Sequence, residues 1–532
     1  MSKETKETKE SKGSTFVQSD VLSKILDNQV KTILEGSKVK DLIAEETPKI
    51  PNKDIKEKAI EELAYGVVRY IDELSEQYSE HEKVEILKER KKYLSKEKMI
   101  NLAIQKIEEQ IGDILNKIIH HEKFQKLEAS WIGLKNLIFK TDTSEKLKIK
   151  VLNVSKDELL QDFSVDLEKP EESDLYKKVY EQEYNMFGGE SYGVLIGDYE
   201  IDHSTNDMDF LESIAAVAAS AHAPFITSAS KKLFKLTEDD DFRKLSDKSS
   251  IKRIFSNKSK YARWNSFRNS EHSKYVALTL PHVLMRLPYG NDNPIESISS
   301  FKEDLSEHNY FLWGNTAYVL GERITNSFSL YGWCAAIRGV EGGGLVEGLP
   351  LYTYDIDENT TVQKCPTEMQ ISDTKEKEFS DLGLIPLVHC KNTDYAAFFG
   401  TQSLNIPKKY DTPQANANAR LSAQLQYTLC ASRFSHYLKS MMRDMIGSFA
   451  TNDQVAKYLN RWINQYVVLD DDAGQELKAQ YPLREARVDV SEIKGKPGCY
   501  NAIVYLRPHY QLDELTISMR LVSELPPPAK RG

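Results

Sequence analysis

Residues 192–226, YGVLIGDYEIDHSTNDMDFLESIAAVAASAHAPFI, contain two short apolar runs with a helical stretch between them. The first run, Val194–Ile196, ends at a glycine and an aspartate, and the second begins at Pro224. The stretch from Asp207 to Ala221 has the apolar pattern of a helix. Strands that alternate with helices are typical of a mixed α/β core, which we place over residues 131–430.

The same pattern continues on both sides of this stretch. Short apolar runs recur at Cys334–Ile337 and Ile385–Val388, with another helical stretch over Trp313–Ser327. Upstream, residues 147–151 alternate apolar side chains with lysines, as a half-exposed strand would. With helices and strands added at its two ends, the chain as a whole is predicted to be α+β.

The N-terminal residues have a different composition. Residues 1–19 repeat Lys-Glu-Thr units and carry too few apolar groups to offset the entropy of ordering, so we expect a disordered tail. Residues 20–130 are predicted to form a charged helical region. It contains six isoleucines that step by four and three residues: Ile100, Ile104, Ile107, Ile111, Ile114 and Ile118. This heptad-like seam packs either against helices of the same chain or against a partner.

Residues 431–532 are predicted to be a C-terminal domain of long helices and strands. One helix is expected from Asn416 to Phe449. Alternating residues at Arg484–Val490 and Tyr500–Leu506, joined by a glycine- and proline-rich turn, predict a hairpin, and residues 515–521 predict a third strand. Strands this close to a terminus leave edges that must be covered, charged or paired with another chain.

The composition excludes several functional classes. The chain has 532 residues, with 71 Lys and Arg against 81 Asp and Glu, a net charge of −10. Nucleic-acid binders normally carry a basic excess, so we expect no nucleic-acid partner. Five cysteines without a C-x-x-C pair indicate reduced thiols in the cytoplasm. The first twenty residues contain no apolar run, and no stretch reaches about 20 apolar residues, so neither a signal peptide nor membrane insertion is expected.

Motifs of catalysis are absent from the sequence. There is no P-loop, no G-x-S-x-G elbow and no H-E-x-x-H helix, so we assign no catalytic, cofactor-binding or metal-binding residue. The best metal-like cluster is Asp198, Asp202, His203 and Asp207. Its spacing matches no known loop, which favours turn and capping roles, with Asp207 as a helix N-cap. A metal-dependent enzyme that uses Asp198 or His203 is the alternative.

Three other features allow chemistry as a second interpretation. His389 and Cys390 could form a thiol-dependent enzyme, but neighbours on a strand point to opposite faces, which favours a buried structural cysteine. No helix pattern follows Gly342–Gly344, which favours a tight loop over a phosphate site. Basic and aromatic residues interleave over residues 248–274. They fit either a nucleic-acid-binding scaffold or packed aromatic rings beneath a basic patch for an acidic protein.

Several long segments together resemble one family, the large subunit of the type VI secretion contractile sheath. The matching segments are YGVLIGDYE (192–200), AHAPFI (221–226), LPHVLMRLPYG (280–290), FLWGN (311–315), GWCAAIRGVEGGGLVEGLP (332–350), HCKNTDYAAFFG (389–400), PKKYDTPQANANARLSAQLQYTLCASRFSHYL (407–438), LNRWINQYV (459–467) and LRPHYQLDELTISMRLVSELPPPA (506–529). The resemblance covers about residues 130–530. Within the family, the chain is most similar to the intracellular-growth-locus branch, the IglB-like proteins.

The resemblance implies an assembly protein without catalysis. Family members form an obligate heterodimer with a small sheath subunit, and the heterodimers stack as helical rings around an inner tube of hexamers. Contraction drives this tube out through a baseplate, and a AAA+ ATPase later remodels the contracted sheath. The expected partners are therefore the small subunit, other copies of this chain, the inner tube hexamers, the baseplate and the ATPase.

Two segments are expected to carry these contacts. Helical arrays need non-closing interfaces, and uncovered terminal strands can supply them by β-augmentation. The residues assigned to inter-subunit strands are Arg484, Ala486, Val488, Val490, Tyr500, Ala502, Val504 and Leu506. The amphipathic helix over residues 21–33 lies where some family members present a segment to the ATPase, with Leu22, Ile25 and Leu26 as its anchors. A plain packing helix is the equal alternative for that segment.

Overall fold

The computed structural model describes residues 96–164, 170–237, 240–246, 250–257, 259–295, 298, 301–357, 360–445, 451–470, 472–492, 500–509 and 511. The helix predicted over residues 21–33, with Leu22, Ile25 and Leu26, and the strand predicted over residues 515–521 lie outside these ranges. The chain divides into two compact units. Residues 122–288 and 305–532 belong to one unit, and residues 1–121 with 289–304 belong to the other.

In the smaller unit, α5 (Lys96–Ile119) carries the isoleucine seam. The segment 289–304 is attached to its C-terminal end, where the backbone N–H of Asp304 donates to Asn116 Oδ1 at 3.1 Å. The seam residues Ile104, Ile107, Ile111, Ile114 and Ile118 are between 37% and 58% exposed.

The larger unit is built on a six-stranded sheet. Its strands, in spatial order, are β1 (Leu195–Ile201), β2 (Phe225–Ala229), β3 (Val276–Leu280), β9 (Leu384–His389), β10 (Ala396–Phe398) and β6 (Leu345–Val346). The first four are parallel, and the last two add antiparallel pairs. Because helices cover both faces, β2 and β3 are buried along their whole length. The predicted mixed core is confirmed.

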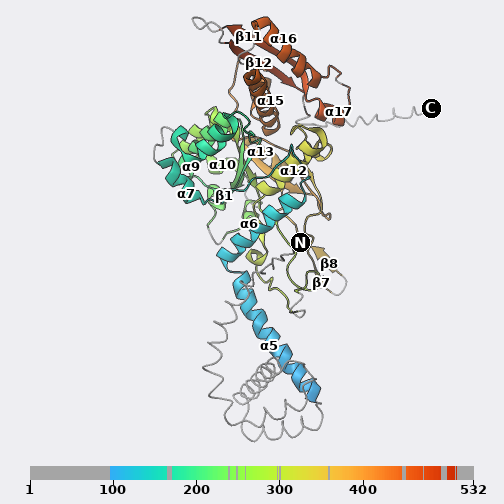
Figure 1. Ribbon diagram of the computed structural model, residues 1–532. Coiled ribbons are helices and arrows are strands. Elements are labelled where there is room, and N and C mark those ends of the chain that lie inside the picture. Colours follow the sequence, from blue (N-terminus) through green and yellow to red (C-terminus); the bar gives the residue numbers. More distant parts are fainter. Residues whose placement is uncertain are drawn as a thin grey trace, which may run out of the picture. The chain divides into compact units, whose positions relative to one another are not determined.

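Two layers of helices cover this sheet (Figure 1). α7 (Lys156–Ser164) and α9 (Thr205–Ala221) pack on one face, and α6 (Glu122–Phe139) and α12 (Ala317–Tyr331) pack on the other. Adjacent residues of β2 enter different cores, Phe225 the first and Ile226 the second. This division follows from the two-residue period of a strand. The remaining elements here are α8 (Asp174–Tyr176), a π-helix (Lys177–Tyr184), α10 (Lys252–Phe255), α11 (Ala262–Arg268), α13 (Asp373–Asp381), β4 (Val283–Leu284), β5 (Trp313–Gly314), β7 (Thr353–Asp357) and β8 (Thr360–Gln363).

Several predicted elements differ from the structure. Residues 147–151 and Cys334–Ile337 form no strand, because neither stretch pairs with another strand of the described chain. The helix expected over Asn416–Phe449 is two helices, α14 (Pro413–Ser422) and α15 (Leu425–Asp444). The break occurs at Gln424, whose ψ of 133° is extended. There the N–H of the next residue donates to the carbonyl of Thr401 at 2.8 Å instead of continuing the helix.

The C-terminal part of the larger unit has its own apolar core. Its elements are α15, α16 (Asn452–Ile463), α17 (Gln475–Gln480), β11 (Leu483–Glu492) and β12 (Tyr500–Pro508). Trp333 stacks on Phe434 of α15 with ring centres 4.1 Å apart. Leu459 of α16 and Val488 of β11 pack into the same core. The predicted hairpin strands therefore exist, and one face of the hairpin is buried against helices.

Candidate functional site: the edge of the terminal hairpin

The eight residues assigned to inter-subunit strands lie together in one hairpin. The register pairs Ala486 with Leu506, Val488 with Val504 and Val490 with Ala502. Arg484 lies at the register shift that begins β11, and Tyr500 pairs with Glu492 at the other end. Of the eight side chains, those that pack into the C-terminal core are Ala486, Val488, Val490, Ala502 and Leu506. A neighbouring chain would therefore use the backbone of these strands.

The outer edge of β11 is covered within the chain at two residues, Val488 and Leu483. The Nδ2 group of Asn460, on α16, donates to the carbonyl of Val488 at 2.7 Å, and its Oδ1 accepts from the N–H of Val488 at 2.9 Å. Both backbone groups of Val488 therefore point away from β12. Nearer the start of the strand, the N–H of Val468 donates to the carbonyl of Leu483 at 2.9 Å. A side chain and a loop thus occupy the positions that another strand would take.

The outer edge of β12 has no neighbouring strand among the described residues. Directly opposed residues of an antiparallel pair turn their backbone groups the same way, inward or outward. Val504 therefore points its N–H and C=O away from β11, and so do Ala502 and Leu506. Within the ranges that the structure describes, these outward groups make no hydrogen bond. The side chains of Ile503 and Tyr505 beside them are 48% and 50% exposed. Among the described residues, nothing covers the outer edge of β12, and this edge carries apolar side chains.

A second exposed apolar surface lies on α6. The inner face of this helix packs against α12, where a Cβ at Gly133 would lie 2.5 Å from the ring of Tyr318. The outer face carries side chains that are between 39% and 65% exposed: Phe124, Leu127, Trp131 and Ile138. Their spacing of three, four and seven residues is that of a helix–helix seam. α6 is therefore apolar on both sides, which is typical of a helix that packs against a partner as well as its own core.

α15 is attached to the sheet core through buried imidazoles. His436 Nε2 donates to the carbonyl of Ala221, at the end of α9, at 2.9 Å. His222 Nδ1 lies 3.0 Å from the hydroxyl of Tyr275. Burial lowers the pKa of His436 to about 4 and also lowers the pKa of His222. Both rings are therefore neutral at neutral pH.

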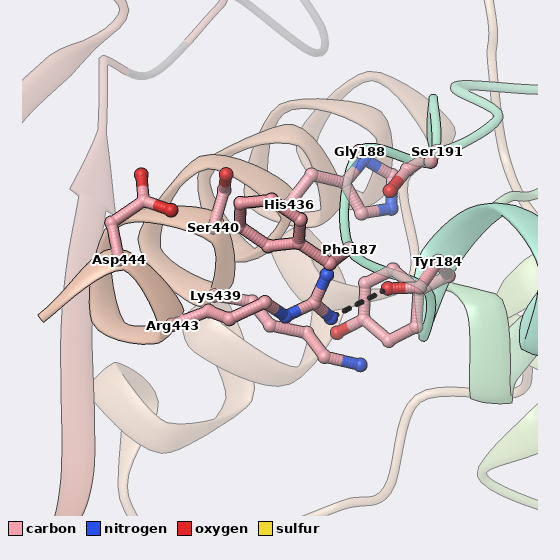
Figure 2. Close-up of a pocket in the computed structure, with 10 residues that line it drawn as sticks. Tyr184, Phe187, Gly188, Ser191, His436, Lys439, Ser440, Arg443 and Asp444 are labelled. Atoms are coloured by element: carbon pink, nitrogen blue, oxygen red, sulfur yellow. Dashed lines mark hydrogen bonds between the residues drawn. The ribbon is translucent and has the colours of Figure 1, made fainter. Parts of the chain in front are cut away.

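A cavity of about 220 Å³ lies next to these imidazoles, between α15 and the loop after Tyr184 (Figure 2). Arg443 donates to the carbonyls of Met186 and Tyr184 at 2.7 and 3.2 Å. The Nζ of Lys439 lies 3.5 Å from the centre of the Tyr184 ring. Both cations thus hold the loop to α15, and the cavity fits a structural joint better than a ligand site.

The metal-like cluster forms local turns and ion pairs. Ser204, and not Asp207 as predicted, is the N-cap of α9, because its side chain accepts from the N–H of Asp207. The carboxylate of Asp207 instead accepts from Lys156 Nζ and from the N–H of Asp202, both at 2.8 Å. The aspartate thereby joins α7 to α9.

The other members of this cluster also have structural contacts. Asp198 accepts a hydrogen bond from the hydroxyl of Ser130. His203 stacks on Tyr261 with ring centres 4.8 Å apart. Across the described part of the chain, no three His, Cys, Asp or Glu side chains converge as metal ligands would. The structure therefore does not support the metal-dependent alternative.

The adjacent His389 and Cys390 do not meet, as the strand geometry predicts. Cys390 is exposed, so the predicted buried cysteine is wrong, and its Sγ lies 3.6 Å from the hydroxyl of Tyr395. His389 Nδ1 instead lies 3.5 Å from Sγ of Cys365. The contact between His389 and Cys365 could not be predicted from the sequence, because the two residues are 24 positions apart and no motif joins them.

The glycine loop and the aromatic–basic stretch are also structural. A Cβ at Gly343, whose φ is +86°, would lie 2.3 Å from the carbonyl oxygen of Ala336, so the loop requires glycine there. In the stretch over residues 248–274, Trp264 is 1% exposed, and Tyr261 and Phe267 are buried too. These rings are unavailable for stacking on bases. Within the described ranges, no helix has the length and hydropathy that a membrane span requires.

Comparisons with known proteins agree with the interpretation of the motifs. The family described as EvpB/VC_A0108, tail sheath N-terminal domain, matches residues 101–405, and its gpW/gp25-like domain matches residues 414–525. The type VI secretion system sheath protein TssC1 of Pseudomonas aeruginosa is 46% identical over 435 residues, which cover 81% of this chain and 86% of that protein.

Solved structures of contractile particles are also similar. A chain of the anti-feeding prophage baseplate aligns over 59% of this chain and 66% of its own length, with 9% identity and a TM-score of 0.32. A chain of the extracellular contractile injection system PVC sheath, in its contracted state, aligns over 59% and 68%, with 8% identity and a TM-score of 0.31. From the two family matches and the 46% identical relative, this chain belongs to the VipB/TssC family of type VI secretion sheath proteins.

Proposed function

We propose that this protein is the structural large subunit of a cytoplasmic contractile sheath and converts no substrate. It pairs with a small sheath subunit, and the heterodimers polymerise as a helical tube around an inner tube that docks on a baseplate. The 46% identical sheath protein supports the general role. The sequence has no nucleotide-binding motif, so the energy for contraction would be stored when the extended sheath assembles.

The observation that carries this proposal is the difference between the two edges of the terminal hairpin. Asn460 covers the edge of β11 at Val488, whereas the outward backbone groups of β12 have no partner in the described chain. An open edge strand binds another strand through main-chain hydrogen bonds. One open edge per subunit gives a directional contact that propagates instead of closing, which a helical polymer requires.

The small subunit is proposed to bind the exposed apolar helices. The outer stripe of α6, with Trp131 at 65% exposure, suits a helix packed in heptad register. The isoleucine seam of α5 has the same spacing and is also exposed. Both stripes are rich in large apolar side chains, which form the buried centres of stable interfaces. Recognition by a AAA+ ATPase through Leu22, Ile25 and Leu26 stays a prediction.

A proline at Val504 tests the strand contact. Val504→Pro removes an outward N–H from β12 without removing a hydrogen bond of the hairpin, so the subunit should fold but form no tubes. The variant is co-expressed with the small subunit, and the particles are examined by negative-stain electron microscopy. Val504→Thr, which keeps the N–H, is the matched control and should form tubes.

Circular dichroism of both variants establishes that the subunit is folded. Tubes of wild-type length and number from folded Val504→Pro would refute the role of this edge. Discrete particles from every variant, wild type included, would refute the sheath function itself.

A further inference from the structure

Cys365 lies in a contact that the sheath role does not use. This residue follows β8, and His389 ends β9. The Sγ of Cys365 lies 3.5 Å from His389 Nδ1 and 3.2 Å from Oγ1 of Thr367. Cys365 is half-buried. A thiol beside an imidazole is the arrangement that generates a reactive thiolate.

The tautomer of His389 is fixed by its other nitrogen. Nε2 lies 2.8 Å from the carbonyl oxygen of Thr393. Because a carbonyl only accepts, Nε2 carries the hydrogen, and in the neutral ring Nδ1 is left as an acceptor that faces the thiol. Transfer of the thiol proton to Nδ1 gives a thiolate and an imidazolium whose two N–H groups both have acceptors.

The electrostatics of the site favour this transfer. Burial raises the pKa of the Cys365 thiol, but the hydrogen bonds from His389 and Thr367 outweigh burial, and the net pKa is lowered. Burial likewise lowers the pKa of His389, and the contact with Cys365 outweighs it and raises the pKa. The neighbouring cation Lys364 is directed to His308 instead, with Nζ 3.1 Å from its Nδ1.

The other cysteines provide internal comparisons. Burial raises the pKa of Cys334 to about 12 and raises that of Cys430 as well, so both are unreactive thiols. Cys390 is more exposed than Cys365 but faces the hydroxyl of Tyr395. Of the four cysteines that lie within the described ranges, Cys365 alone contacts an imidazole.

We propose that Cys365 is an oxidation site that reacts with hydrogen peroxide. The thiolate sulfur attacks one peroxide oxygen, an S–O bond forms and the O–O bond breaks. The departing hydroxide takes the proton from His389 Nδ1 and leaves as water. The sulfur is oxidised to a sulfenic acid, and the peroxide is reduced.

The modification would act on a segment that holds the sheet together. Immediately after Cys365, the carbonyl of Pro366 accepts from the N–H of Leu284 on β4 at 2.8 Å. Two residues further on, Glu368 accepts from the buried His282 at 2.7 Å. An added oxygen on Cys365 therefore lies beside contacts that join β4 and the end of β3 to this segment.

The test follows each cysteine of the purified full-length chain by mass spectrometry. The protein receives a pulse of hydrogen peroxide with dimedone, which traps sulfenic acids, at about pH 6.5, where an ordinary thiol is protonated. Cys365 should be labelled several-fold faster than the more exposed Cys390, because only the Cys365 thiol faces an imidazole that can take its proton. His389→Gln should remove this advantage and leave Cys390 unchanged.

A second measurement on the wild type does not depend on the variant folding. The pH midpoint of iodoacetamide alkylation should be lower for Cys365 than for Cys390. Labelling of Cys365 that is no faster than that of Cys390, or an equal or higher midpoint, would overturn the proposal. So would unchanged Cys365 labelling in folded His389→Gln.

Discussion

The backbone N–H and C=O groups find hydrogen-bond partners in different ways in the central sheet and in the terminal hairpin. In the sheet, β2 and β3 have neighbours on both sides and helices on both faces. In the hairpin, one face packs on α15 and α16, the other is exposed, and the edge of β12 has no neighbour in the described chain. A two-stranded sheet is marginal without such support. The central strands β2 and β3 are thus paired on both sides within the subunit, whereas the outer backbone groups of β12 have no partner among the described residues.

This difference suits the proposed sheath. A core whose central strands are paired on both sides within the subunit can move as a rigid body, and a strand shared between subunits can hold the polymer together during the movement. The comparison makes three predictions, which concern the sheet, the joint at α15 and the hairpin. They are ordered by how much each substitution is expected to change the free energy of unfolding.

The largest effect is expected at His282, which lies beyond the end of β3. Its Nδ1 is 2.7 Å from Glu368 and its Nε2 is 3.3 Å from Glu200. Burial lowers the pKa of His282, but the two carboxylates outweigh burial and raise the pKa to about 10. His282→Gln removes the imidazolium that both carboxylates contact, and we expect a loss of about 3–5 kcal/mol in the free energy of unfolding. Chemical denaturation at about pH 7 measures it.

The pH dependence identifies the charge as the cause. A pKa raised in the folded state stabilises the protein below about pH 6.5, the unfolded value, and this stabilisation is lost as the pH rises towards about 10. The difference between wild type and His282→Gln should therefore shrink progressively as the pH rises from about 6.5 to about 10. His272→Gln, at an exposed histidine, is the control. An undiminished difference at high pH would contradict the ion-pair explanation.

Helices and strands whose sequence pattern is local could be predicted from the sequence. The apolar runs predict β1, β2 and β9, and the alternation predicts β11 and β12. The contact between His282 and Glu368 could not be predicted from the sequence, because these residues are 86 positions apart and meet only through the sheet topology. Asn460 was missed for the same reason, since its role depends on how α16 packs on β11. Which edge of the hairpin is open is therefore a property of the packing and not of the strand pattern.

A smaller effect is expected at the joint between the two regions. Burial holds the pKa of His436 at about 4, so the ring is neutral in the native state near neutral pH, even though its contact with the carbonyl of Ala221 favours the charged form. Because the unfolded pKa is about 6.5, the native state should lose up to about 3 kcal/mol as the pH falls from 6.5 to 4. His436→Gln keeps a donor for the carbonyl and removes this titration. Denaturation curves between those pH values measure the difference.

The groups around His436 contribute in the same direction. Arg433, Lys439 and His222 are cations or become cations on acidification, and each opposes a charge on His436. His222, whose pKa burial also lowers, leaves part of the acid sensitivity in His436→Gln. The variant should therefore lose less stability than wild type over this range, but still some. An identical loss in both proteins would show that His436 does not cause the acid sensitivity.

The smallest change in stability, and the sharpest test of the comparison, is expected at Asn460. Asn460→Ala leaves the N–H and C=O of Val488 unpaired at the edge of β11, at a cost of about 1–3 kcal/mol. Hydrogen exchange should become faster at the Val488 amide and remain unchanged in β2. Asn460→Asp, which keeps an acceptor for the N–H, should have an intermediate effect, and Lys457→Ala on the exposed face of α16 should have none.

Asn460→Ala also changes how many strand edges of the hairpin are open. Its effect on assembly can therefore be measured separately from its effect on stability. Val504→Pro removes the open edge of β12 and should leave the subunit unable to associate, whereas Asn460→Ala adds an edge at β11 and should produce branched or irregular aggregates. Light scattering and electron microscopy distinguish the two outcomes. Regular, unbranched tubes from Asn460→Ala would show that the covering of β11 is not what makes the contact directional. The open edge of β12 would then no longer be sufficient to explain why only one strand of the hairpin recruits a neighbour.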